Sequence, residues 1–304
     1  MPLEAKRSVL VTGGRGFVGR ALVKLLRCKG YPVISMDRSP APADEERGWL
    51  EVEGDVSKGP RFRSVVRDHR IHSIIHLAAI LPTAAHQDPV TAFEVNFEGG
   101  INVLAEARSL GVHRLVFGSS LSVYGTYPAG RVVSEDDDAT PLDSYGAAKI
   151  FLEGRGLASR EDGGMDFVSL RIGRVVGPGS NSVTSAWRSE IFELLKSRRP
   201  VEIFIPYRAT EKILVAHVDD VAEMLVALLS ASRTEHAIYN APCEAILVGD
   251  LKRFVESLNP NVTIRLGDGQ AVGNPQMLDF SRFQREFAVE TIPLFDRLRK
   301  AAGK

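Results

Sequence analysis

Residues 8–19 read SVLVTGGRGFVG, and this stretch decides the expected fold. Its first five residues have the character of a buried strand, and the residues from Phe17 onward have the apolar spacing of a helix. Between them, Gly13, Gly16 and Gly19 permit a tight turn, a close approach of the backbone to a pyrophosphate, and close packing of helix on strand. The amides that open the helix would then face the phosphate charge. The stretch predicts a dinucleotide-binding turn, with a purely structural turn as the alternative.

The next predicted strand, Val33–Asp37, ends in an acid 18 residues beyond Gly19. A carboxylate at that place accepts hydrogen bonds from both ribose hydroxyls and repels a 2′-phosphate, so Asp37 favours NAD. Arg38 follows directly and has the chemistry to hold a 2′-phosphate, which keeps NADP open as the less favoured cofactor.

Farther along, apolar strands alternate with helical patterns. The strands are expected at residues 73–77, 114–117 and 167–172, and the helices at residues 90–110 and 145–159. Strands that are apolar throughout and separated by helices pair in parallel, with both sheet faces covered. The sequence therefore predicts an α/β fold, a Rossmann-type doubly wound parallel sheet.

Beyond Gly173 the alternation becomes less regular, with glycine and proline turns. We expect a Rossmann domain over residues 1–173, to which residues 213–240 return. A small C-terminal substrate-binding lobe is expected from residues 174–212 and 241–304.

The composition excludes several classes of protein. The chain has 304 residues, 44% hydrophobic and 25% charged, and its 38 Lys and Arg balance its 38 Asp and Glu, so we expect no nucleic-acid partner. No apolar run reaches the roughly 20 residues that span a bilayer, so no membrane partner is expected. Two cysteines provide neither a disulfide framework nor a thiolate metal cage. The first residues lack the features of a signal peptide, and a cytoplasmic protein is expected.

A second group of residues has the chemistry of proton transfer. Tyr145 and Lys149 are four residues apart, so they share one face of the predicted helix. A neighbouring ammonium and a nicotinamide cation favour tyrosinate, which suits the phenol to proton transfer near neutral pH. The serine-rich segment 119–122 directly follows a predicted strand, at the sheet edge where such folds bind ligands, and can hold a substrate oxygen.

Together these motifs resemble the extended short-chain dehydrogenase/reductase family, in its branch of sugar-nucleotide epimerases and dehydratases. They run in family order over about residues 8–225. Besides the glycine turn, the matching motifs are GDV at 54–56, HLAA at 76–79, Asn96 with Gly99 and Asn102, SSLSVYG at 119–125, YGAAK at 145–149, GPG at 177–179 and HVDDVA at 217–222.

The resemblance implies a role for each matching residue. Ser120 would bind the reacting oxygen, Tyr145 would be the acid/base, and Lys149 would bind the nicotinamide ribose and lower the pKa of Tyr145. Ser122 or Tyr124 would touch substrate. Among the expected cofactor contacts, Asp55 and Val56 would lie at the adenine, and Leu77, Ala78 and Ala79 would line the middle of the cofactor. The other cofactor contacts expected from the motifs and the resemblance are Gly13, Gly16, Phe17, Val18, Gly19, Asp37, Arg38, Tyr145 and Lys149. Family members often dimerise through the helices at 90–110 and 145–159, so a homodimer is expected.

Departures from the family pattern bear on the substrate. Arg174 stands where nucleotide-sugar enzymes usually carry Asn, and the uncharged residues 213–216 stand where an arginine usually grips a sugar-nucleotide phosphate. Residues 184–191 look more like the branch that oxidises small sugar acids, such as the erythronate and uronate dehydrogenases. Arg174 is then suited to fork onto a substrate carboxylate, with a surface or ion-pairing role as the alternative.

The leading hypothesis is an NAD-dependent oxidoreductase that transfers hydride at a hydroxyl of a sugar or sugar acid. A UDP-sugar 4-epimerase with retained NAD and a non-catalytic NAD(P)-sensing protein are the alternatives. Dehydration is disfavoured because Leu121 and Ser122 replace the additional acid of dehydratases. No metal site is expected, because the rings of His69, His72 and His76 are not expected to converge.

Overall fold

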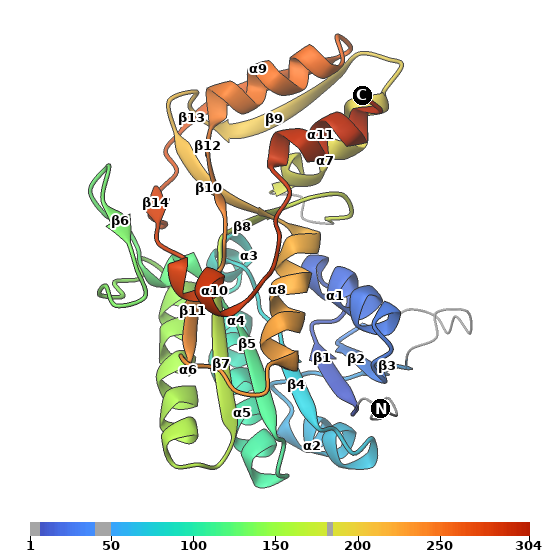
Figure 1. The fold of residues 1–304 in the computed structure, drawn as a ribbon, viewed down its shortest axis with the longest axis vertical. Coiled ribbons are helices and arrows are strands. Elements are labelled where there is room, and N and C mark those ends of the chain that lie inside the picture. The colour runs from blue at the N-terminus through green and yellow to red at the C-terminus, as the bar shows by residue number, and fades with distance from the viewer. Residues whose placement is uncertain (1–6, 40–49, 181–184) are drawn as a thin grey trace.

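The computed structural model describes residues 7–39, 50–180 and 185–304 (Figure 1). Its centre is a seven-stranded sheet in the order β11-β7-β5-β4-β1-β2-β3, and every neighbouring pair is parallel. The strands are β1 Val9–Thr12, β2 Val33–Asp37, β3 Leu50–Glu53, β4 Ser73–His76, β5 Arg114–Ser120, β7 Asp166–Ile172 and β11 Ile238–Asn240. The chain fills the sheet outward from β1 in both directions, so the predicted doubly wound Rossmann-type sheet is confirmed.

Alternation along the strands supplies a core on each face of the sheet. In β1, Val9 and Val11 join one apolar cluster while Leu10 joins the other. The first cluster is covered by α1 Phe17–Cys28 and α8 Val218–Ser230, and the second by α2 Gly59–Asp68, α5 Gly100–Ser109 and α6 Ser144–Glu161 (Figure 1). Both faces are therefore buried, which explains why the strands are apolar throughout.

The helical stretch expected at residues 90–110 contains a π-helical turn. It consists of α4 Pro89–Phe93, the π-helical segment Glu94–Gly99, and α5. Within that turn Asn96 bonds to the backbone of Ile80 in both directions, at 2.8 and 2.9 Å. The π-helical turn thereby ties the helix to the segment that follows β4.

A smaller lobe with its own core lies above the carboxyl edge of the sheet (Figure 1). A three-stranded sheet joins β8 Arg174–Val176, β10 Lys212–His217 and β12 Glu244–Leu247, and a parallel pair joins β9 Val201–Tyr207 and β13 Val262–Gly269. The helices of the lobe are α7 Trp187–Glu193, α9 Val248–Leu258 and α11 Leu294–Ala302.

Some segments connect the two parts. In the stretch 213–240, β10 belongs to the small sheet, whereas α8 packs on α1 and β11 is the edge strand of the large sheet. Helix α10, Ser281–Glu286, also lies against β11, where Phe283 is fully buried. The expected domain boundaries stay a prediction.

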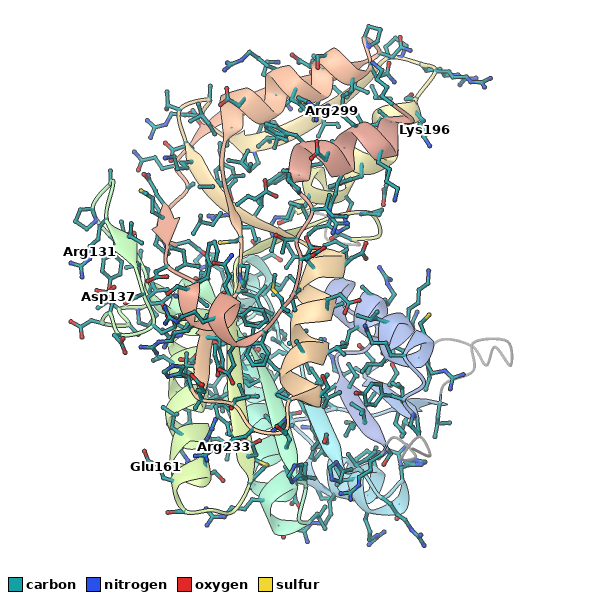
Figure 2. All side chains as sticks on the ribbon, viewed as in Figure 1. Arg131, Asp137, Glu161, Lys196, Arg233 and Arg299 are labelled. Carbon is teal, nitrogen blue, oxygen red and sulfur yellow. The ribbon has the colours of Figure 1, made fainter. Side chains whose placement is uncertain are left out.

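An excursion between β5 and α6 carries the acidic run 135–138. Its short strand β6, Val132–Val133, pairs with β14, Met277–Leu278. Elsewhere in the chain, the short helix α3, Pro82–Gln87, precedes α4. The Arg131 guanidinium pairs with Asp137 on this excursion (Figure 2). Within the described ranges, no helix combines the length and the apolar character that crossing a membrane requires.

Candidate active site

The glycine turn lies where β1 meets α1, at the point from which the sheet is built in both directions. Gly13 has φ +68°, and a Cβ there would lie 2.7 Å from the backbone nitrogen of Ala78. A Cβ at Gly19 would lie 2.2 Å from the Gly13 oxygen. Gly16 precedes the first residue of α1, and no side chain caps that end. The turn is thus a backbone cradle that side chains would fill, which fits a bound pyrophosphate.

Acidic side chains stand at the ends of the next two strands. The Asp37 carboxylate accepts a hydrogen bond from the Arg15 amide, 3.1 Å, and so lies beside the glycine turn. The Asp55 carboxylate accepts one from the Ser57 amide, 2.9 Å. Arg38 is exposed, and Val56 is buried in the core. These positions fit the adenosine end of a dinucleotide on one side of the turn.

Leu77, Ala78 and Ala79 directly follow β4, on the other side of the turn. The Ala78 amide donates to the Thr12 hydroxyl, 3.3 Å, and all three residues are half-buried. The expected contacts Asp37, Asp55 and Leu77–Ala79 therefore follow one another at the ends of β2, β3 and β4.

The expected catalytic residues come together at the end of β5. Ser120 is the last residue of that strand, and its hydroxyl accepts a hydrogen bond from the Ser122 amide, 3.1 Å. Tyr145 and Lys149 lie on α6, with the Lys149 Nζ 5.4 Å from the centre of the Tyr145 ring. The same Nζ donates to the Gly118 carbonyl, 2.8 Å. The Ser120 hydroxyl lies close enough to the phenol of Tyr145 to lower its pKa, so the three side chains form one group.

Protein groups alone do not prime this tyrosine. Burial raises the pKa of Tyr145 to about 12, although hydrogen bonding to Ser120 and the charge of Arg188 lower it. Burial lowers the pKa of Lys149 to about 7, with Glu153 acting in the opposite direction. Lys149 is not among the groups that set the pKa of Tyr145 here, and the expected lowering of the Tyr145 pKa by Lys149 stays a prediction.

The residues expected to touch substrate are placed differently from one another. Ser122 is half-buried, with its hydroxyl 3.2 Å from that of Ser120. Tyr124 is fully buried, donates to the Asn240 amide oxygen at 2.7 Å and accepts from Arg171 at 2.8 Å. The structure does not bring Tyr124 into the site, because both of its partners are protein groups.

Arg174 lies at the boundary between the sheet and the smaller lobe. It is half-buried at the start of β8, and its Nε lies 3.4 Å from the Tyr207 hydroxyl. Arg188 lies beside the same tyrosine and was not singled out from the sequence. Arg188 belongs to the segment 184–191, which resembles the sugar-acid branch. A basic residue within that segment is the sequence signal that points to Arg188. Thr184, the first residue of that segment, lies outside the described residues.

The three neighbouring histidines do not form a metal centre. His76 is buried, its Nδ1 lies 2.7 Å from the Thr12 hydroxyl, and burial lowers its pKa to about 3. The ring of His72 instead lies tilted against the ring of His113, with 4.9 Å between centroids. In the described part of the chain, no three His, Cys, Asp or Glu side chains gather as metal ligands.

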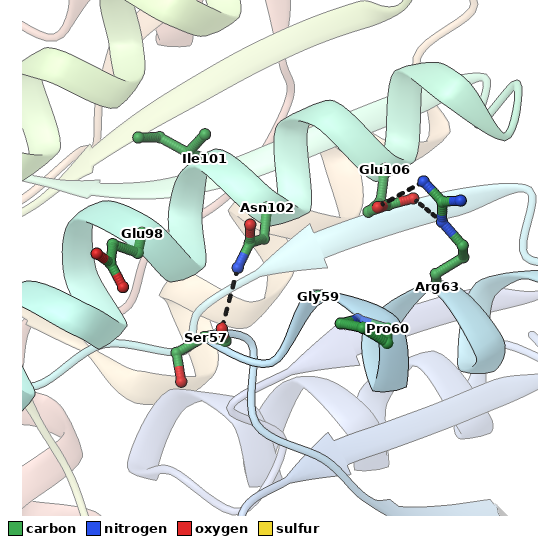
Figure 3. Close-up of a pocket in the computed structure, with 8 residues that line it drawn as sticks. All are labelled: Ser57, Gly59, Pro60, Arg63, Glu98, Ile101, Asn102 and Glu106. Atoms are coloured by element: carbon green, nitrogen blue, oxygen red, sulfur yellow. Dashed lines mark hydrogen bonds and ion pairs between the residues drawn. The ribbon is translucent and has the colours of Figure 1, made fainter.

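A separate surface pocket of about 610 Å³ lies between α2 and α5 (Figure 3). Arg63 and Glu106 form a two-pronged ion pair in it, at 2.7 and 2.9 Å. It contains none of the expected catalytic residues, so we do not identify it with the active site.

The chain is similar to a known protein family and to individual members of it. The model described as the NAD dependent epimerase/dehydratase family matches residues 9–241. A UDP-glucose 4-epimerase of Azospirillum brasilense is 30% identical over 152 residues, 49% of this chain and 43% of that protein. A 3-beta-hydroxysteroid dehydrogenase of Mycolicibacterium neoaurum is 32% identical over 185 residues, 58% of this chain and 49% of that protein. The matched segment thus spans about half the length of these curated relatives.

Solved structures match over nearly the whole chain. The Thermus thermophilus UDP-glucose 4-epimerase in complex with NAD has a TM-score of 0.83 and 25% identity, covering 97% of this chain and 98% of that one. An L-threonine dehydrogenase from Clostridium difficile has a TM-score of 0.85 and 20% identity, covering 99% and 98%. The second likeness shows the fold alone.

Proposed function

Because the chain belongs to the NAD-dependent epimerase/dehydratase family, we propose that it is an NAD-dependent oxidoreductase acting on a hydroxyl of a sugar or sugar acid. One observation carries this proposal. Ser120, Tyr145 and Lys149 are grouped at the carboxyl edge of the sheet, the same edge at which the glycine turn lies. A protein that only senses NAD(P) has no need of such a group, so we favour an enzyme.

The backbone cradle at Gly13 supports NAD as the cofactor. The turn and the start of α1 would hold the pyrophosphate, Asp37 the adenosine ribose, and Lys149 the nicotinamide ribose. The remaining contacts are those expected from the sequence, at Phe17, Val18, Arg38, Asp55, Val56, Leu77, Ala78 and Ala79. When bound, NAD supplies the hydride acceptor.

The chain's own residues handle the proton. Ser120 holds the substrate oxygen by a hydrogen bond, and the Tyr145 oxygen takes the hydroxyl proton. For this the pKa of Tyr145 must fall from about 12, and added positive charge at the site has that effect.

The phosphate clamp of nucleotide-sugar enzymes has no counterpart at residues 213–216. All four side chains are apolar and at least 95% buried in β10, so that stretch offers no cation to a diphosphate. We therefore propose net dehydrogenation of a small sugar acid over epimerisation of a nucleotide sugar. The names of the curated relatives support the UDP-sugar 4-epimerase reading, which we keep as the second candidate.

A substrate panel tests the choice. Erythronate and uronates are offered with NAD, NADH is followed by its absorbance, and UDP-glucose is incubated in parallel. We expect NADH to accumulate with an acid. Interconversion of UDP-glucose and UDP-galactose without net NADH would instead establish the epimerase.

Replacing Asp37 tests the cofactor assignment. Asp37→Ala should weaken NAD by about tenfold or more, because a charge-assisted hydrogen bond to the ribose is lost, and should weaken NADP less. Fluorescence titration with both cofactors measures this. Equal losses for the two would show that Arg38, not Asp37, selects the cofactor.

We propose a homodimer formed through α4, α5 and α6, where an aromatic patch is exposed. Phe97 lies 5.0 Å from Phe93 and 5.8 Å from Phe151 between ring centroids, and Phe93 and Phe151 are 53% and 43% exposed. Phe151→Glu should convert a dimer into a monomer, as measured by light scattering. The matched control is Phe204→Glu, because Phe204 is also 43% exposed but lies on β9. A monomeric parent protein would contradict the proposal.

A cytoplasmic location stays a prediction.

A further inference from the structure

Two arginines lie together where the large sheet meets the smaller lobe. The Arg174 guanidinium lies 5.5 Å from the centre of the Tyr207 ring, and Arg188 lies close enough to the same tyrosine to interact with its hydroxyl. Arg188 is also near enough to Tyr145 for its charge to lower the pKa of that phenol. Arg188 therefore stands near the proposed acid/base, with Arg174 next to it at Tyr207.

Neither arginine is paired with an acid among the residues that the structure describes. The Nε of Arg188 is buried and has no hydrogen-bond partner. By contrast, the buried guanidinium of Arg171 is held by Glu153 at 2.7 Å. The chain thus neutralises a buried arginine behind the site but leaves the pair at the site without a carboxylate.

This arrangement is unfavourable for the protein by itself. Burial lowers the pKa of Arg188, and the charge of Arg174 acts in the same direction. A buried donor without an acceptor adds a desolvation cost. An anion placed between the two guanidinium groups would remove both penalties, and the planar fork of arginine matches the two oxygens of a carboxylate.

Arg188 is held in place by its helix. Trp187 is 2% exposed, and its ring lies edge-on to Tyr207 with 6.4 Å between centroids. The Ser189 hydroxyl donates to the Gly177 carbonyl at 2.6 Å. Because both neighbours of Arg188 are fixed, the backbone that carries its side chain is set before any ligand binds.

We infer that Arg188 and Arg174 together bind a carboxylate of the substrate, and that Arg188 determines specificity for an acid. The inference rests on the proposed function, because it places the acid group beside the hydroxyl whose proton Tyr145 takes. In a nucleotide sugar a whole sugar ring separates the 4-hydroxyl from the diphosphate, so a phosphate is the less suitable anion here.

Equilibrium binding tests the inference without turnover. NAD-loaded Tyr145→Phe protein is titrated by calorimetry with D-erythronate and D-glucuronate, with the neutral erythritol and D-glucose, and with UDP-glucose. We expect the acids to bind more tightly than their neutral counterparts. Adding Arg188→Met should weaken the acids on the order of 10- to 100-fold and leave the neutral compounds unchanged. Arg188→Lys should give intermediate affinities.

Controls separate binding from folding. Arg265→Met removes a surface arginine that pairs with Glu202, and should leave every affinity unchanged. Arg188→Met should leave NAD affinity unchanged and should not lower the melting temperature, because a buried unpaired charge is removed.

Three outcomes would overturn the inference. They are equal binding of acids and neutral compounds, acid affinities unaffected by Arg188→Met, and a loss confined to UDP-glucose. The last would identify a phosphate site. Absence of NADH formation in the wild-type protein would count against the proposed function alone.

Discussion

Replacing Tyr145 with phenylalanine should lower turnover by about 10²- to 10⁴-fold, the usual contribution of a positioned acid/base. The change removes a single oxygen from a side chain that is 8% exposed, so packing is retained. NAD affinity should stay within a few fold, because the nicotinamide ribose is assigned to Lys149. Steady-state rates with the active acid from the panel, and fluorescence titration with NAD, measure the two effects.

The control for this variant is Tyr127→Phe. The Tyr127 hydroxyl donates to the Asp138 carbonyl on the acidic excursion, away from the catalytic group, so its loss should leave turnover unchanged. If Tyr145→Phe retained full activity, the catalytic assignment would be wrong. If both activity and NAD affinity collapsed, the effect would be structural.

Features that depend on neighbours in the sequence could be predicted. The glycine turn is encoded locally, because spacing alone places its residues between a strand and a helix. The pair Tyr145 and Lys149 follows from helical periodicity. Ser120 lies near them because it ends β5, at the edge of the sheet where the carboxyl ends of the parallel strands lie. Helix α6, which carries Tyr145 and Lys149, packs against β5.

Features that depend on distant contacts could not be predicted. Tyr124 has the right motif and the right strand end, but Arg171 and Asn240, from β7 and β11, enclose its hydroxyl. The raised pKa of Tyr145 comes from burial, which no spacing reports. Arg188 meets Arg174 only because α7 and β8 pack together in the smaller lobe.

Several elements also gave no usable sequence signal. The short strands β8 and β12 are only three and four residues long, so neither shows a periodicity. By contrast, the strand β13 follows an Asn-Pro-Asn turn at residues 259–261, and the sequence expectations above do not include it. It forms because its apolar residues Val262 and Ile264 complete the core beneath α9.

Replacing Lys149 with methionine should change the pH dependence of stability. Burial lowers the Lys149 pKa from 10.5 to about 7, so between these values the unfolded chain binds more protons than the folded chain. The free energy of unfolding of the wild-type protein therefore falls as the pH is lowered from about 10 to 7. Tyr145 acts at higher pH, because its raised pKa removes stability between about 10 and 12. Urea unfolding of both proteins between pH 7 and 9.5 isolates the lysine.

The slope, not the absolute stability, is the decisive quantity. Lys149→Met also removes the hydrogen bond to the Gly118 carbonyl, which lowers stability equally at every pH. The free energy of unfolding of the variant, relative to that of the wild type, should therefore increase as the pH falls toward 7. Lys252→Met, which removes a half-exposed lysine paired with Glu256, should keep the wild-type slope. A wild-type slope in Lys149→Met would mean that the lysine is solvated and not buried as described.

The same variant should lose turnover by about 100-fold or more and bind NAD more weakly. This loss and the gain in stability toward neutral pH have one physical cause. A buried ammonium is unfavourable in the folded chain, and the resemblance assigns to this same ammonium, beside the phenol, the lowering of the Tyr145 pKa. If Lys149 has that role, the residual activity of Lys149→Met should rise steeply with pH. Without the ammonium, the Tyr145 phenol loses its proton only at higher pH. A residual activity that is independent of pH between 7 and 9.5 would show that Lys149 serves only to bind the cofactor.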